Sequence, residues 1–148
     1  MINWTTCTTI REKLQTLSPL IWLGIRLSIG ITFALTGYGK LTHLNETTQF
    51  FESLHIPYAY ANAIVASSVE LLGGIALCVG LLTRLAAFGL TAIMGVAIVT
   101  AKAEELTSIT NLIAFQEWDY ILFLLLLVVT GAGKLSLDHF VFNREKTH

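Results

Sequence analysis

Two ionisable side chains, Arg26 and Glu70, stand inside long apolar stretches of the sequence. A charge at the centre of a membrane helix is unfavourable by about 2.5–3.5 kcal/mol on an insertion scale, so such residues usually face other helices and find polar partners there. Each belongs to a row of small residues at helical spacing, which allows two helices to approach closely. The two rows are Arg26, Gly30, Ala34 and Gly37, and Ala66, Glu70, Gly73 and Gly74. We therefore expect both charges to face the interior of a helix bundle.

Two interpretations of Arg26 and Glu70 follow from their positions. In the first, they form a structural polar clamp between helices. In the second, they form a proton- or quinone-handling site, in which Glu70 accepts or releases a proton and Arg26 orients a carbonyl oxygen. A rise of 1.5 Å per residue places Arg26 about 9 Å and Glu70 about 18 Å from the same membrane face, so the spacing does not require a direct contact.

Further polar residues gather near the opposite ends of the apolar stretches. Lys40, Glu117 and Asp119 could extend a site toward the outer membrane face, although we favour solvation at the interface as their explanation. His43 and His55 lie in the loop after the first apolar stretch, without the fixed spacing of metal ligands. We therefore predict no metal site.

The composition indicates a membrane protein. Hydrophobic residues make up 54% of the 148 residues and charged residues only 13%, against roughly 25% in soluble domains. The mean hydropathy is +0.69, and so few charges do not cover a water-exposed surface. A net charge of −1 without a dense basic stretch argues against nucleic acid as a partner. Cys7 and Cys78 form no C-x-x-C pair, so we infer neither a disulfide nor thiol redox chemistry.

Four membrane helices are expected to position these residues. The predicted spans are residues 20–38, 61–82, 85–101 and 113–133. The strictly apolar part of the last span, Tyr120–Ala132, has only 13 residues, whereas a span needs roughly 20. We therefore extend that helix back to Ile113, which places Glu117 and Asp119 in its first turns. Because lipid offers no partners to backbone groups, the spans must be helical, and the fold is predicted to be all-α, a four-helix transmembrane bundle.

Basic residues predict the orientation of this bundle. Six fall on the side that holds both chain ends, and two fall on the other side. The six are Arg11, Lys13, Arg84, Lys134, Arg144 and Lys146, and the two are Lys40 and Lys102. Since loops rich in Lys and Arg stay inside, both termini are expected in the cytoplasm. The predicted organisation is a cytoplasmic segment at 1–19, a membrane domain at 20–138 and a cytoplasmic tail at 139–148.

Several short motifs, taken in order, resemble the DoxX family of small bacterial membrane proteins. They are Arg26, Gly37-x-Gly39-Lys40, Ile56-Pro57, Glu70-Leu71-Leu72-Gly73-Gly74, Gly80-Leu81-Leu82-Thr83-Arg84, Glu117 and Gly133-Lys134-Leu135-Ser136-Leu137-Asp138. The resemblance covers about residues 20–138. It implies a four-helix protein of the bacterial inner membrane that is part of an oxidoreductase complex linked to thiol and oxidative stress. The family is named after a subunit of an archaeal quinol oxidase complex.

Three functions are compatible with these observations. The leading hypothesis is an accessory subunit of a membrane redox system that contacts quinone and a partner protein. The second is a carrier of small solutes or ions with Glu70 as a protonatable gate, and the third is a non-catalytic membrane scaffold. The sequence contains no haem, flavin or iron–sulfur motif, so electron transfer would use a cofactor from elsewhere. Whether the chain is itself an enzyme is left open.

Overall fold

All regular structure in the described part of the chain is helical. The computed structural model describes the backbone of residues 4–133 and 135–142, and the side chains of residues 16–133 and 135–141. The helices are α1 (Trp4–Thr42), α2 (Leu44–Ser53), α3 (Ala59–Val79), α4 (Thr83–Ala101), α5 (Ile109–Ala114), α6 (Gln116–Thr130) and α7 (Leu137–Phe142). The predicted all-α class is confirmed.

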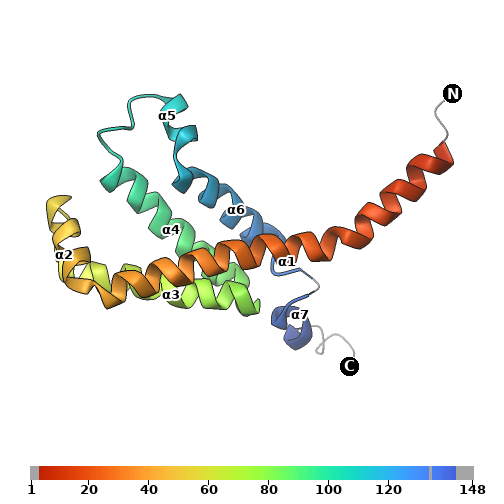
Figure 1. Ribbon diagram of the computed structural model, residues 1–148, viewed down its shortest axis with the longest axis horizontal. Coiled ribbons are helices and arrows are strands. Elements are labelled where there is room, and N and C mark those ends of the chain that lie inside the picture. Colours follow the sequence, from red (N-terminus) through yellow and green to blue (C-terminus); the bar gives the residue numbers. More distant parts are fainter. Residues whose placement is uncertain (1–3, 134, 143–148) are drawn as a thin grey trace.

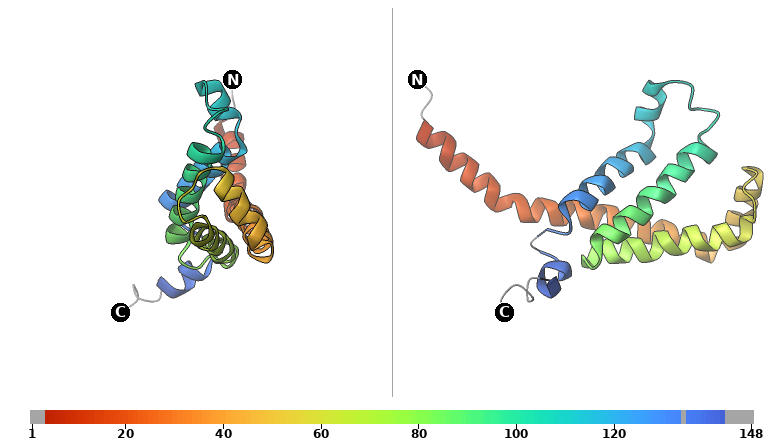
Figure 2. Two further views of the ribbon diagram at one scale, coloured as in Figure 1. Left: turned by 90° about the vertical axis from the view of Figure 1, so that its left-hand side faces the viewer. Right: turned by 180° about the vertical axis from the view of Figure 1, so that it is seen from behind.

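The long helices form two antiparallel pairs. Helix α1 packs along α3, and α4 packs along α6, while a tight turn joins α3 to α4. The two pairs meet near α7 and diverge toward α2 and α5 (Figures 1 and 2). We call the end of the bundle near α7 the turn end, and the end near α2 and α5 the loop end.

Close contact between α1 and α3 depends on glycine. A Cβ atom at Gly30 would lie 2.8 Å from the carbonyl oxygen of Gly74, and one at Gly37 would lie 2.8 Å from that of Ser67. Real side chains do not tolerate such distances, so the two backbones approach only because these positions lack a Cβ. The row of small residues on α1 is therefore a helix contact, as predicted.

A small apolar core joins the two pairs. Phe33 of α1, Leu77 of α3, Leu90 of α4 and Leu124 of α6 are all buried in it. The ring of Phe33 lies 5.3 Å from that of Tyr120, between centroids, which links α1 to α6. The core thus contains residues from all four long helices, and the outer faces of these helices lie outside it.

Those outer faces are apolar. Large hydrophobic side chains such as Leu85, Val99 and Val129 are about 70% exposed, an arrangement that suits lipid rather than water. Among the described residues, three helical segments are long and apolar enough to cross a membrane: Thr16–Thr42 of α1, α3 and α4. The chain is therefore a membrane protein with at least these three candidate spans.

The fourth helix differs from the prediction in its bounds. Extended backbone at Phe115 (φ −77°, ψ 134°) separates α5 from α6, so a continuous helix from Ile113 is wrong. The helix does begin before Tyr120 and carries Glu117 and Asp119 in its first turn, as predicted. With 15 residues it rises about 22 Å, less than the roughly 30 Å of the hydrocarbon core.

The first helix is also longer than its apolar run. It begins at Trp4 and continues through Pro19 to Thr42, and its first part bends away from the bundle (Figure 1). A proline inside a helix removes one backbone hydrogen bond and favours such a bend. The short helices α2 and α7 were not predicted. Residues 143–148 of the predicted C-terminal tail lie outside the described residues.

Candidate functional site

Glu70 is buried in the seam between α1 and α3 and is paired with Lys40. The Lys40 Nζ atom lies 2.6 Å from Glu70 Oε1. The Glu70 side chain is 1% exposed and that of Lys40 is 38% exposed. The carboxylate is therefore sealed inside the protein, and its partner reaches it from the surface. We call this the outer pair, after the membrane face predicted for Lys40.

The glycine contact explains how the outer pair forms. Gly37 lies one helical turn before Lys40, and its missing Cβ lets α1 rest on the backbone of α3 between Ser67 and Leu71. Helix α1 ends two residues after Lys40, at Thr42. The hydroxyl of Thr47 on α2 donates to the Lys40 carbonyl oxygen at 3.2 Å and fixes this end of α1. These backbone contacts thus place the Lys40 ammonium group beside the Glu70 carboxylate.

Two polar atoms beside this pair have no partner. Glu70 Oε2 and Ser67 Oγ are buried and lack hydrogen bonds within the described residues. Ser67 precedes Glu70 by three residues, so both side chains lie on one face of α3. Buried polar groups are nearly always hydrogen-bonded, and each exception calls for an explanation such as a functional role. Arg26 Nε and Thr83 Oγ1 are also buried without a partner in the described part of the chain, but only Glu70 adds a free carboxylate oxygen, which makes this the strongest candidate for a binding site.

Arg26 lies at the turn end and contacts backbone instead of carboxylate. Its Nη1 donates to the Ala132 carbonyl oxygen at 2.6 Å, and its Nη2 donates to that of Leu135 at 2.8 Å. Both carbonyls follow the end of α6, where no helix supplies them with donors. Among the described residues, Arg26 forms no hydrogen bond or ion pair with Glu70. A direct clamp between these two charges is therefore not formed.

The segment after α6 also caps α4. The Asp138 carboxylate accepts hydrogen bonds from the backbone N–H groups of Leu82 at 2.7 Å and Thr83 at 2.9 Å. The Asp138 N–H in turn donates to the Gly80 carbonyl at 2.9 Å. A negative side chain at a helix N-terminus satisfies free donors and complements the helix dipole.

Gly80 completes this arrangement. It has a positive φ of 73°, and a Cβ there would lie 2.6 Å from Arg26 Nη1. Two sequence motifs more than 50 positions apart thus meet at one arginine. We call this cluster the Arg26 junction. It consists of Arg26, Gly80, Leu82, Thr83, Ala132, Leu135 and Asp138.

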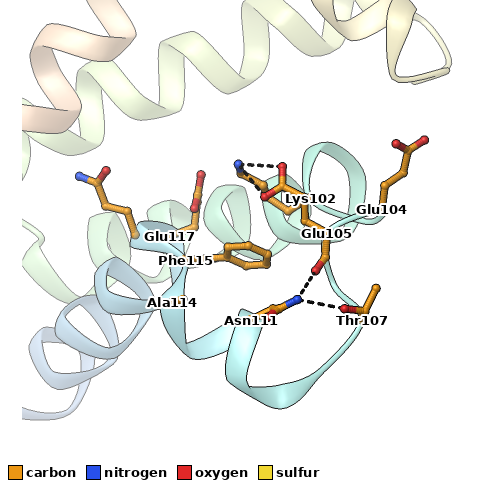
Figure 3. Close-up of a pocket in the computed structure, with 9 residues that line it drawn as sticks. Lys102, Glu104, Glu105, Thr107, Asn111, Ala114, Phe115 and Glu117 are labelled. Atoms are coloured by element: carbon orange, nitrogen blue, oxygen red, sulfur yellow. Dashed lines mark hydrogen bonds and ion pairs between the residues drawn. The ribbon is translucent and has the colours of Figure 1, made fainter.

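The remaining predicted residues, Glu117 and Asp119, lie elsewhere. Glu117 is partly exposed and lines an open hollow of about 720 Å³ at the loop end, formed by the segment after α4, by α5 and by the first turn of α6 (Figure 3). Lys102 borders the same hollow, 3.3 Å from a Glu105 carboxylate oxygen and 5.6 Å from the centre of the Phe115 ring. Asp119 is exposed.

The structure therefore brings Lys40 to Glu70 but does not bring Glu117 or Asp119 to them. Within the described part of the chain, no hydrogen bond joins either acidic residue to the outer pair. The same part holds no group of three or more His, Cys, Asp or Glu side chains that could bind a metal ion.

Sequence reasoning missed three contributors to these sites. Ser67 lies three residues before Glu70, and this spacing alone could have placed it beside the carboxylate. Gly80 and Asp138 belong to recognised motifs, but neither motif indicates that both meet Arg26. Pairing between Lys40 and Glu70 was not predicted either, since Lys40 stands beyond the predicted first span.

Comparisons with known proteins agree with this picture. The DoxX family model matches residues 21–103, which contain the outer pair, Arg26 and the α3–α4 turn. The chain is 36% identical over 126 residues to the "Putative oxidoreductase CatD" of Bacillus subtilis, covering 82% of this chain and 87% of that protein. It is 29% identical over 127 residues to the "Inner membrane protein YphA" of Escherichia coli, covering 81% and 89%. No solved structure matches.

Proposed function

The chain belongs to the DoxX family of membrane proteins, and from that premise we propose that it is an accessory subunit of an oxidoreductase system in the bacterial inner membrane. We further propose that it contacts quinone at the outer pair. One observation carries this proposal: a carboxylate buried between membrane helices keeps one oxygen without a partner among the residues that the structure describes. The similarity to a protein named as an oxidoreductase supports the redox association.

The outer pair has the features that such a contact needs. Lys40 neutralises the Glu70 charge, which would otherwise be strongly unfavourable away from water. The second carboxylate oxygen then remains available to accept a hydrogen bond or a proton from a bound head group. Electrons would pass to a cofactor held by a partner protein, while this chain binds and orients the quinone.

The Arg26 junction has a separate role in this proposal. Its guanidinium already donates to two backbone carbonyls, so it holds the end of α6 rather than a ligand. We therefore give Arg26 a structural role, although the sequence had suggested that it could orient a quinone carbonyl. The junction also holds two unpaired buried atoms, Arg26 Nε and Thr83 Oγ1, but among the described residues only the outer pair leaves a buried carboxylate oxygen free for a quinone head group.

Mass spectrometry of gently solubilised protein tests the proposal. The informative variant is Lys40→Met with Glu70→Leu, because removing both charges leaves neither one stranded. The matched control applies the same two changes at the loop-end hollow, as Lys102→Met with Glu117→Leu. Quinone or quinol should co-purify with the wild type and the control but not with the outer-pair variant. Equal amounts of quinone and quinol in all three proteins, or neither in the wild type, would refute the quinone contact.

A proton-coupled carrier is the second candidate, because the unpaired Glu70 oxygen could bind a proton during transport. Purified protein in liposomes with a trapped pH-sensitive dye distinguishes the two. Solute-dependent proton uptake that disappears in the outer-pair variant would favour the carrier. If membrane function survived the loss of both Arg26 and Glu70 charges, a scaffold role would replace both proposals.

We also propose that both termini face the cytoplasm, which places Lys40 on the periplasmic side. The excess of basic residues on the side of the termini supports this orientation. A phosphatase that is active only in the periplasm, fused after His148, should therefore be inactive. The same reporter inserted in the loop before α5 should be active. The opposite pattern would reverse the orientation.

A further inference from the structure

Ser67 and Glu70 differ in what they offer to a ligand. The Ser67 hydroxyl both donates and accepts hydrogen bonds, whereas an ionised carboxylate only accepts. Glu70 Oε1 is occupied by Lys40, so Oε2 is its free acceptor. Ser67 is completely buried and Glu70 is 1% exposed, so within the described residues neither free atom is satisfied by protein or reached by bulk water. One face of α3 therefore offers a ligand two unused groups: the Ser67 hydroxyl as a donor and Glu70 Oε2 as an acceptor.

We propose that Ser67 and Glu70 together bind a hydroxyl group and discriminate against a carbonyl group. The ligand hydroxyl donates its hydrogen to Glu70 Oε2, and its oxygen accepts the Ser67 hydrogen. A carbonyl oxygen has no hydrogen to donate, and its partial negative charge would face the carboxylate. A site with buried groups of this kind rejects the analogue that leaves them unpaired.

This inference rests on the proposed function for the identity of the ligand. If the ligand is a member of the quinone pool, the site favours the reduced form, which carries hydroxyl groups, over the oxidised form, which carries carbonyls. Ser67 is then a residue that determines specificity, although it carries no charge and stands outside the recognised motifs. The redox state of the pool would decide how much of the site is occupied.

Access to the two atoms is set by Lys40. The glycine contact fixes the α1 and α3 backbones, so the seam itself does not open easily. Lys40 is the partly exposed member of the pair, and its flexible four-carbon side chain is able to swing outward. A ligand head group therefore enters from the Lys40 side.

Equilibrium binding of three probes to the purified chain in nanodiscs tests the inference. The probes are a short-tailed quinol kept under anaerobic reduction, the matching quinone, and an alkylphenol that has a hydroxyl but no quinone chemistry. The wild type should bind quinol and phenol at least about tenfold more tightly than quinone, the factor expected from one hydrogen bond. Ser67→Ala should reduce the affinity for both hydroxyl probes about tenfold.

Two variants control this experiment. Ser68→Ala makes the same change at the next position of α3, which points to a different helix face, and should change no affinity. Glu70→Gln places an amide N–H where the carboxylate stood, so it should narrow or invert the preference for quinol over quinone. If Glu70→Gln fails to fold by size-exclusion chromatography, the comparison of Ser67→Ala with Ser68→Ala still decides.

The outcomes separate this inference from the quinone contact. Tight binding of phenol and quinol supports both, and tight binding of phenol alone supports the hydroxyl site but refutes the quinone contact. Quinone binding as tight as quinol binding refutes the hydroxyl preference and leaves the quinone contact standing. No binding of any probe refutes both.

Discussion

The Arg26 junction and the outer pair solve the same problem in different ways. Each buries a charge inside a membrane bundle, where an unpartnered charge is strongly unfavourable. At the junction, Arg26 donates to two carbonyls that the end of α6 leaves free, and Asp138 caps α4. At the outer pair, within the described part of the chain, Lys40 satisfies only one oxygen of the Glu70 carboxylate and the Ser67 hydroxyl beside it is unpaired.

Under the proposed function, this difference separates a structural role at the junction from a binding role at the outer pair. The junction uses its polar groups to join segments far apart in sequence: α1, the α3–α4 turn and the chain after α6. The outer pair joins only α1 to α3. Within the described residues each region keeps two buried polar atoms without a partner, Arg26 Nε and Thr83 Oγ1 at the junction and Glu70 Oε2 and Ser67 Oγ at the outer pair, but only the outer pair leaves a carboxylate oxygen free. Buried polar groups with unused capacity lower stability, so they are typical of sites that bind or react.

The largest effect is expected from removing Arg26. Arg26→Leu leaves the Ala132 and Leu135 carbonyls without donors and should lower the free energy of unfolding by about 3 kcal/mol. Thermal unfolding in detergent, followed by circular dichroism, measures this loss. Arg26→Lys should recover little, because an ammonium group does not reproduce the planar fork of the guanidinium.

Arg84→Leu is the matched control for this prediction. Arg84 is exposed, and its Nη2 lies 3.4 Å from the Val129 carbonyl oxygen, a long contact. The control should therefore change stability by less than about 0.5 kcal/mol. Equal losses in Arg26→Leu and Arg84→Leu would show that the junction does not hold the bundle together.

The outer pair should respond asymmetrically to single substitutions. Lys40→Met leaves the Glu70 charge buried and unpaired and should destabilise by about 2–3 kcal/mol. Glu70→Leu leaves a lysine that is able to turn to water, so its loss should be about 1 kcal/mol. The double variant should recover most of the Lys40→Met loss. A double-mutant cycle on thermal unfolding measures the coupling.

The same cycle applied to Arg26 and Glu70 corrects an expectation from the sequence. If these charges compensated each other, neutralising both would restore part of the stability lost with one. They share no hydrogen bond within the described residues, so Arg26→Gln and Glu70→Gln should instead be additive within about 0.5 kcal/mol. A clear recovery in the double variant would restore the clamp between these charges.

A smaller effect is expected at the cap of α4. Asp138→Ala removes the acceptor for the Leu82 and Thr83 N–H groups and should destabilise by about 1–2 kcal/mol. Asp138→Asn keeps one oxygen acceptor and should lose less. Thermal unfolding compares the two. Identical losses would indicate that the charge, rather than the hydrogen bonds, stabilises the turn.

Hydrophobicity and spacing predicted much of this architecture. Apolar runs identified the three long spans, and rows of small residues identified the α1–α3 contact at Gly30 and Gly37. Both signals work because lipid imposes length and apolarity on a helix, and because close backbones require small side chains. Burial of Arg26 and Glu70 followed from the same reasoning.

The partners of those charges were not predictable. Arg26 binds backbone carbonyls, which every residue carries, and these are free only because α6 ends at Thr130, before Gly131 with its positive φ of 79°. Lys40 stands beyond the apolar run, and the length of α1 past Tyr38 decides that it reaches Glu70. Such details depend on helix ends, where hydropathy is least informative.

The smallest effect is expected at the loop-end hollow, where substitutions test whether the binding site is confined to the outer pair. Glu117 is partly exposed and Asp119 is exposed, and within the described residues they lack hydrogen bonds to the outer pair. Glu117→Gln and Asp119→Asn should therefore each change stability by less than about 0.5 kcal/mol. They should also leave quinol binding unchanged, which the nanodisc assay measures. Weaker quinol binding in either variant would mean that the site extends from α3 across to α6, and that the outer pair is only one side of it.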